Sequence, residues 1–422
     1  MANPRTSHNL PTSAKDSMEP FWHFEKHYLH DHRSTDILPI SEIIDVVVIG
    51  AGYAGIATAY NLVKNEIAHV QALKELILHE KIDCDFTLTR KCDVWNNPDA
   101  ADDAKAIYDR LCLNPELSYM EDVHFTIGKD AETMSSILHI FSKYCFTNRA
   151  QISGVKGAKV CSTYTAATLC PYKLITSLLA STLTTGSVNL QTNTPVILIK
   201  QSAGGYYLVE TSRGILRAQK VVHANNAYVS SLLPEYAKNI ISCKGICCNI
   251  TVPKDATAPP IGYSYIVRTE DGIPNYLIPR PDGSIIVGGA SATFRSHKDQ
   301  WYNNVDDGKL IEATMKERYY EKFMQRTFRG WENSDAKIEG IWTGVMGFSF
   351  DSNPHIGLVP QNSDQFIIAG FNSHAKGLAE MLRTGKSFEE VHVPMPLPRL
   401  FKTTQDRIDR AQDGPEGGDI LN

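Results

Sequence analysis

The stretch that decides the fold of this chain is Asp45-Val46-Val47-Val48-Ile49-Gly50-Ala51-Gly52-Tyr53-Ala54-Gly55-Ile56-Ala57-Thr58-Ala59-Tyr60. An apolar run enters a turn that carries three glycines, and a helical pattern of small residues follows at once. This order of strand, glycine turn and helix is the context that a dinucleotide-binding fingerprint requires. The stretch therefore predicts an α/β fold with a nucleotide at the turn.

The three glycines serve different purposes in such a motif. Gly50 allows the tight turn, Gly52 lets the backbone approach a pyrophosphate, and Gly55 lets the helix lie close to the strand. The unpaired N–H groups and the dipole at the helix N-terminus then favour the negative phosphates. A glycine triplet alone is also compatible with an ordinary turn, but the strand before it and the helix after it favour the nucleotide interpretation.

Composition limits the classes of protein to which the chain can belong. Its 422 residues suffice for about two or three domains. A hydrophobic fraction of 42% with 21% charged residues is typical of a soluble globular protein, and a net charge of -5 gives no electrostatic reason to expect a nucleic-acid partner. We find no secretory signal and no run long enough to span a membrane, so we expect no membrane partner.

The cysteines favour a reducing compartment. There are nine, an odd number, and they are scattered rather than arranged as a disulfide framework. The one cluster, formed by Cys243, Cys247 and Cys248, has a spacing that matches no zinc site, so small buried strand residues are the better interpretation and no metal site is predicted. We therefore expect a cytoplasmic protein.

Residue periodicity predicts further elements along the chain. Helices are expected within 101–144, at 172–179 and at 310–326. Strands are expected at 188–199, 206–211, 215–222, 245–252, 276–279, 284–288 and 366–369. The strand that ends at His223 runs into the small polar residues 224–228, a type of strand end at which open α/β sheets bind ligands.

Several pieces in this order resemble the D-amino-acid-oxidase-like family of FAD-dependent oxidoreductases, and more narrowly its fungal and γ-glutamylputrescine-oxidase-like amine oxidases. Together they extend from about Phe21 to Thr404. Only the glycine turn is widely shared among other families, whereas the ordered set is far more specific. The pieces are 45–60, 191–196, 221–228, 276–283 and 342–374.

The resemblance implies an α/β fold in which an FAD/NAD(P)-binding, Rossmann-like domain of the glutathione-reductase type is interleaved with an α+β substrate domain that contains an antiparallel sheet. The FAD-binding domain is expected at 45–82, 151–200, 215–242 and 335–390. The substrate domain is expected at 83–150 and 243–334. An N-terminal arm (1–44) and a C-terminal tail (391–422) complete the expected division.

The resemblance also assigns residues to the cofactor. It implies contacts from the glycine turn, from a strand start near the adenine, from the end of the strand before Ala224, and from a C-terminal segment that supports the flavin ring. These expected FAD-binding residues are Gly50, Ala51, Gly52, Tyr53, Ala54, Gly55, Val196, Ala224, Asn225, Gly344, Gly370, Phe371 and Asn372. Some relatives attach the flavin covalently through a cysteine at the position that Gly344 occupies here, so noncovalent FAD is expected.

Three residues are candidates for the catalytic side of the site: His374 beside the flavin ring, Tyr276 as an aromatic wall, and Arg280 as a cation for a substrate carboxylate. His374 is equally compatible with a surface or helix-cap histidine, and Arg280 with a turn residue that pairs with Asp282. The reaction implied is hydride transfer from the carbon that bears an amine to flavin N5, followed by hydrolysis of the imine. The substrate is then a small amine or amino acid, and the electron acceptor stays open because strand 283–289 lacks the lysine that some amine oxidases use with oxygen.

Two departures from the family keep other functions open. A dinucleotide fold normally has a second strand that ends in Asp or Glu about 20 residues beyond the glycines, whereas residues up to Glu80 fit helical spacing better than a strand that ends in Glu80. Later, His374 joins Ala375-Lys376-Gly377 directly, without the family's intervening turn, so Lys376 is not assigned to the substrate. The alternatives are a variant with impaired or no catalysis and, less favoured, an NAD(P)-dependent dehydrogenase.

Overall fold

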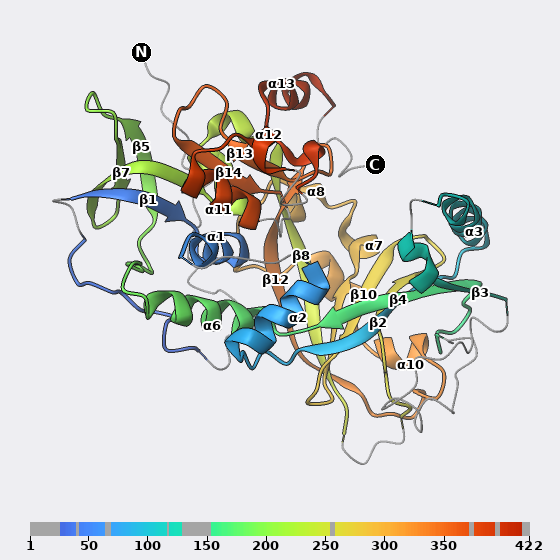
Figure 1. Ribbon diagram of the computed structural model, residues 1–422. Helices are drawn as coiled ribbons and strands as arrows, with labels where there is room; N and C mark the ends of the chain where they lie inside the picture. The colour runs from blue at the N-terminus through green and yellow to red at the C-terminus, as the bar shows by residue number, and fades with distance from the viewer. Residues whose placement is uncertain are drawn as a thin grey trace.

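The computed structural model describes residues 26–38, 42–63, 69–115, 118–128, 153–253, 258–370, 375–392 and 397–415. In these residues the chain forms a six-stranded sheet and an eight-stranded sheet, with helices against both (Figure 1). This is the mixed α/β architecture, with a Rossmann-like part and an antiparallel part, that the sequence predicts.

The six-stranded sheet contains the glycine turn. β1 runs parallel to β7, and β14 runs parallel to the last residues of β7, so three parallel strand ends lie together. β13, β6 and β5 extend the sheet in antiparallel fashion. Its strands are β1 (Ile43–Ile49), β5 (Val196–Gln201), β6 (Tyr207–Thr211), β7 (Gly214–His223), β13 (His355–Leu358) and β14 (Gln365–Ala369).

Two helices cover this sheet beside the glycine turn. α1 (Tyr53–Val63) begins directly after the turn and packs against α11 (Ala375–Thr384). Apolar side chains from α11, β7 and β14, among them Val222, Ile368 and Leu378, form a fully buried cluster beneath them. The parallel strands are therefore covered by helices, as parallel sheets require.

The eight-stranded sheet has the order β12-β8-β11-β10-β9-β2-β4-β3 and is antiparallel except for the pair β2 and β9. Its longest strands, β8 and β12, pair along their whole length and run through the middle of the molecule (Figure 1). The strands are β2 (Thr87–Trp95), β3 (His124–Ile127), β4 (Val160–Thr168), β8 (Ile240–Thr251), β9 (Ser264–Arg268), β10 (Pro274–Pro279), β11 (Ile285–Gly289) and β12 (Lys337–Ser349).

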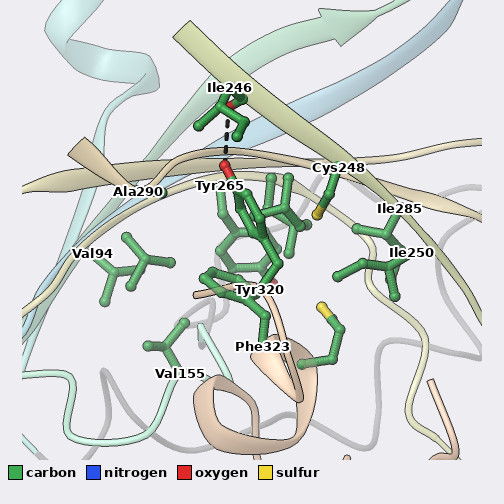
Figure 2. Close-up of a cluster of buried hydrophobic side chains, with 14 of the residues drawn as sticks. Val94, Val155, Ile246, Cys248, Ile250, Tyr265, Ile285, Ala290, Tyr320 and Phe323 are labelled. Atoms are coloured by element: carbon green, nitrogen blue, oxygen red, sulfur yellow. Dashed lines mark hydrogen bonds between the residues drawn. The ribbon is translucent and has the colours of Figure 1, made fainter. Parts of the chain in front are cut away.

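One face of this sheet packs against short helices. Figure 2 shows the buried cluster between them, in which strand residues such as Val94 and Cys248 meet Tyr320 and Phe323. The Tyr320 hydroxyl donates a hydrogen bond to the Ile246 carbonyl at 2.9 Å, which satisfies the one polar group of that side chain. The helices on this face are α7 (Ser291–Phe294), α8 (Lys298–Trp301), α9 (Glu312–Lys316) and α10 (Phe323–Thr327).

The remaining helices lie around the two sheets. α6 (Pro171–Leu183) has proline at its start, where the missing N–H costs little, and it packs with α2 (His69–Glu80) and with Leu29 in a third apolar cluster. The others are α3 (Pro98–Cys112), α12 (Phe388–Val391), α13 (Gln405–Asp413) and the 3-10 helices η3 (Ser118–Asp122), η4 (Asn226–Ser231), η5 (Pro234–Tyr236) and η6 (Arg399–Phe401). No helix within the described ranges is long and apolar enough to cross a membrane.

The structure differs from the sequence expectations in several elements. β4 and β12 pair within the eight-stranded sheet, although their residues fall in the ranges expected for the FAD-binding domain. The strand expected at 188–199 begins only at Val196, and the helix expected at 310–326 is two short helices. Periodicity alone misses these breaks because backbone pairing partners, not apolar spacing, decide where a strand begins.

In the described part of the segment after α1, residues His69–Glu80 form a helix, so the helical interpretation is confirmed for these residues and the interpretation of 75–80 as a second strand is wrong. Glu80 ends α2 and accepts a hydrogen bond from the Ser181 hydroxyl on α6 at 3.1 Å. It is therefore occupied in helix packing and does not end a strand beside β1.

As a result, β1 lies at an edge of the six-stranded sheet as far as the described residues extend. Within the described part of the chain it pairs only with β7. The Ile49 carbonyl accepts the Ala224 N–H at 2.9 Å, so the backbone groups of Ile49 point toward β7. Because backbone groups alternate sides along a strand, those of Ile44, Val46 and Val48 point away from β7. The strand that a doubly wound sheet normally places on that side is not present among these residues.

Candidate functional site

The glycine turn has the geometry that its three glycines predict. Gly50 has φ +109°, and a Cβ built on it would lie 2.6 Å from the Ala224 carbonyl oxygen. A Cβ on Gly55 would lie 1.9 Å from the Gly50 carbonyl oxygen, which is backbone and cannot rotate away. A Cβ on Gly52 would meet no atom within 4 Å. Two glycines are thus needed by the fold, whereas the third borders open space.

The start of α1 faces the same open space. The Ile56 N–H donates to the Gly52 carbonyl at 3.0 Å, so the first helical turn closes directly on the glycine turn. Ala51 and Tyr53 are exposed and Ala54 is partly exposed. The backbone N–H groups that begin a helix have no partner within it, so this exposed turn can receive an anion.

The loop after β7 lies against the turn. Ala224 contacts Gly50, and the Asn225 amide donates to the Tyr228 carbonyl at 3.1 Å. The Asn225 side-chain oxygen is buried and accepts no hydrogen bond from the residues that the structure describes. The structure therefore brings Ala224 and Asn225 together with the turn, as predicted.

Asn226 joins this loop to the C-terminal segment. Its side-chain oxygen accepts the Gly370 N–H at 2.9 Å. A Cβ on Gly347 would lie 2.8 Å from the same oxygen, so β12 passes close to the loop. The sequence prediction did not select Asn226. Its position directly after Ala224 and Asn225 at a strand end was the available signal.

The other expected cofactor residues lie elsewhere in the two sheets or outside the described residues. Val196 packs against the apolar cluster of the six-stranded sheet, and its partner Thr211 on β6 pairs with Gly214 at the start of β7. Gly344 pairs with Gly245 on β8, and a Cβ on Gly344 would meet nothing within 4 Å. Gly370, with φ +84°, is the last described residue before a gap. Phe371, Asn372 and His374 lie outside the described residues.

Tyr276 lies on the face of the eight-stranded sheet that points away from the helix-covered core. Its side chain is 39% exposed, whereas its neighbours Asn275 and Leu277 are buried. The Tyr276 hydroxyl lies 2.8 Å from the Cys247 sulfur. Burial, reinforced by Cys247, raises the pKa of Tyr276, so the phenol is protonated at neutral pH.

Arg280 is engaged within the protein. Its guanidinium lies 3.1 Å from the Asp282 carboxylate and 3.7 Å from Asp85, and its backbone N–H closes the turn with Ser284 at 2.9 Å. This geometry matches the turn alternative for Arg280. A substrate carboxylate would have to compete with two protein carboxylates for it.

His223 occupies the last position of β7, directly before the loop that lies against the glycine turn. It is fully buried, and its Nε2 lies 2.8 Å from the Gln365 side-chain oxygen on β14. Because Gln365 donates its amide to Asn362, its oxygen faces His223, so Nε2 carries the proton. Burial lowers the pKa of His223 to about 4, and the ring is neutral at physiological pH. The described residues contain no cluster of His, Cys, Asp or Glu suited to a metal ion.

A comparison with models of protein families shows to which family the chain belongs. Residues 66–380 match the family model described as FAD dependent oxidoreductase, the DAO family. The chain belongs to this family. The matched range begins beyond Gly55, so it supports the assignment independently of the glycine turn. FAD is the cofactor of the family.

Solved structures with the same fold include several flavoenzymes. L-proline dehydrogenase from P. horikoshii has a TM-score of 0.62 at 18% identity, covering 83% of this chain and 96% of that one. Glycine oxidase from Bacillus cereus has a TM-score of 0.61 at 15% identity, covering 86% and 99%. L-amino acid deaminase from Proteus vulgaris has a TM-score of 0.56 at 16% identity, covering 84% and 93%. No curated protein matches the sequence significantly.

The described residues fit the diphosphate of FAD. The open direction at Gly52 and the exposed start of α1 belong to the same turn. Gly50, Gly52 and Gly55 would hold the diphosphate through the backbone. On the adenosine side, the acidic strand end that normally holds the ribose is not among the described residues.

Proposed function

We propose that this chain is an FAD-dependent oxidoreductase that oxidises the C–N bond of a small amine or amino acid. The observation that carries the proposal is the turn in which only Gly52 borders open space while Gly50 and Gly55 are closely packed. Family membership and the names of the similar structures, which include amino-acid dehydrogenases, oxidases and deaminases, support the choice of a C–N bond.

When bound, FAD supplies the acceptor for the hydride that leaves the carbon bearing the amine. The chain's own residues bind and orient. The glycine turn and the start of α1 balance the diphosphate charge, and the ring of Tyr276 provides an aromatic wall for the substrate. The amine must be uncharged to react, and the imine that results is hydrolysed by water after release. Noncovalent attachment is part of the proposal, because Gly344 offers no nucleophile.

The test begins with the visible spectrum of the purified chain before and after incubation with FAD. We expect flavin absorbance that passes to the supernatant when the protein is denatured, since the cofactor is not covalently attached. Anaerobic addition of secondary amines, polyamines and amino acids, each in turn, should then bleach the flavin absorbance for at least one class. Flavin that is bound yet stays oxidised with every class would overturn the proposal.

A second candidate is a family variant with impaired or no catalysis. The specific observation in its favour is the edge position of β1, beside which α2 follows α1 without a strand among the described residues. A preparation that neither contains nor takes up FAD would establish this alternative. Reduction of added NAD in place of bound flavin would favour a nicotinamide-dependent dehydrogenase instead.

A further inference from the structure

Three residues on adjacent strands form one rung of the eight-stranded sheet. Cys247 on β8 pairs with Gly288 on β11, and Gly288 pairs with Tyr276 on β10. Directly paired residues in a sheet share one face. The next rung, Cys248, Val287 and Leu277, is buried against the short helices, so the rung of Tyr276 points to the opposite face.

Gly288 leaves room for the Tyr276 ring to lie across β11. A Cβ built on Gly288 would fall 2.0 Å from the ζ carbon of Tyr276 and 2.2 Å from its hydroxyl oxygen. The backbone of Gly288 is not in the left-handed region, which here is adopted by Gly289. Glycine is therefore required at 288 by the ring above it and not by its own dihedral angles.

Cys247 meets the far end of the same ring. Its sulfur lies 2.8 Å from the Tyr276 hydroxyl, one strand beyond Gly288. A tyrosine on a strand normally stands roughly perpendicular to the sheet. Here the ring lies flat along the rung instead, with one end fixed at the sulfur, while 39% of the residue stays exposed.

We propose that Cys247 and Gly288 are positioning residues that hold the Tyr276 ring flat across the sheet, so that its exposed face forms the wall against which the amine substrate lies. The proposal rests on the proposed function for its substrate. It adds to the site two residues that act through the orientation of one aromatic ring.

The kinetic test uses the flavin-loaded protein and the amine that bleaches it best. Cys247→Ala and Gly288→Ala are each expected to raise the KM by about 3- to 10-fold, the range that loss of one hydrogen bond spans, with kcat changed less than twofold. Cys247→Ser should restore the KM, because a hydroxyl can bond the phenol in place of the thiol. Gly340→Ala, on β12 where a Cβ would meet nothing within 4 Å, is the matched control and should leave the KM unchanged.

A double-mutant cycle shows whether Cys247 acts through the Tyr276 hydroxyl or independently of it. Tyr276→Phe removes the hydroxyl that Cys247 contacts, so adding Cys247→Ala to Tyr276→Phe should produce no further change in KM. Additive effects, or a KM that is unmoved in both Cys247→Ala and Gly288→Ala, would overturn the inference.

A readout without turnover keeps the inference distinct from the proposed function. In Gly288→Ala the displaced ring uncovers the Cys247 sulfur, so alkylation of Cys247 by iodoacetamide, followed by mass spectrometry with exposed Cys112 as internal reference, should become several-fold faster than in Gly340→Ala. An unchanged alkylation rate refutes the positioning even if no amine reduces the flavin. If amines reduce the flavin and alkylation accelerates while the KM stays constant, the proposed function stands and the substrate wall is refuted.

Discussion

At the scale of single residues, the glycine turn separates what the fold needs from what the ligand needs. Gly50 and Gly55 face backbone atoms, whereas Gly52 faces space. Substitution at these positions therefore has different consequences although all three belong to one motif.

We expect Gly52→Ala to leave the melting temperature of the FAD-free protein unchanged and to weaken FAD binding at least tenfold, because its methyl group occupies the space expected for the diphosphate. Gly55→Ala should instead lower the melting temperature of the FAD-free protein, because its Cβ would strike the Gly50 carbonyl. Thermal denaturation and fluorescence titration with FAD measure the two effects. Equal loss of stability in both variants would contradict the distinction.

The buried His223 leads to a prediction about how the stability of the folded protein depends on pH. Its folded-state pKa of about 4 lies below the ordinary value of 6.5, so the unfolded chain binds the proton first as pH falls. This histidine therefore costs no stability above pH 6.5 and destabilises the protein progressively between pH 6.5 and 4, by up to about 3 kcal/mol.

In His223→Gln that part of the pH dependence should disappear, since glutamine can bond Gln365 without titrating. Urea denaturation at pH 7, 6, 5 and 4 measures it. His124→Gln, at an exposed position on β3, is the matched control. A profile for His223→Gln parallel to that of the unsubstituted chain would disprove a buried neutral imidazole.

At the scale of elements, the edge position of β1 predicts uneven protection of its backbone. The amides of Asp45, Val47 and Ile49 point toward β7, and those of Ile44, Val46 and Val48 point away from it. In hydrogen exchange with residue-level mass spectrometry, we expect the second set to exchange markedly faster. Equal protection of both sets would mean that another segment pairs with this edge.

A buried arginine, together with the buried Ile408, holds the C-terminal helix α13 against the rest of the molecule. Arg407 donates to both Asp351 oxygens at 2.8 and 2.9 Å and also bonds the carbonyls of Asn353, Pro354 and Lys402. Arg407→Met leaves a partly buried carboxylate without its partner, so we expect a loss of about 3 kcal/mol in unfolding free energy and faster proteolysis of α13. Arg410→Met removes an exposed pair with Asp406 and should cost less than about 1 kcal/mol, and a similar loss in both would contradict this attachment.

At the scale of the whole molecule, the long strands β8 and β12 connect the two halves. The Ser242 hydroxyl on β8 donates to the Ala227 carbonyl at 2.5 Å, and Gly347 on β12 packs against Asn226, in the loop that borders the glycine turn. The cofactor site and the eight-stranded sheet therefore share a continuous contact.

This contact predicts that FAD, when its diphosphate binds at the glycine turn, also stabilises the eight-stranded sheet. Trp301, Trp331 and Trp342 are buried with the eight-stranded sheet, so tryptophan fluorescence reports on that half. At an FAD concentration of about 100 times the Kd, the unfolding free energy seen by fluorescence and by circular dichroism should rise by the same amount, roughly 2.7 kcal/mol. A fluorescence transition unmoved by FAD would show that the halves unfold independently.

How much the sequence predicts depends on how local the physical cause is. The turn at Gly50 and Gly55 follows from sterics within a few residues, and the proline start of α6 from one missing N–H, so both could be anticipated. The bond from Gly370 to Asn226 joins residues 144 positions apart in the sequence, and only the folded chain shows it. The same is true of the contact between Tyr276 and Cys247 across Gly288.

By itself, the sequence determined that a strand, a glycine turn and a helix would form beside an anion site, because dihedral limits and sterics act between neighbours in the chain. Only the tertiary structure decided that β1 pairs with β7 alone among the described strands, that β4 and β12 belong to the eight-stranded sheet, and that Arg280 pairs with Asp85 as well as with Asp282. Strand neighbours and ion-pair partners are chosen by the energy of the whole packed chain, and local spacing carries no record of that choice.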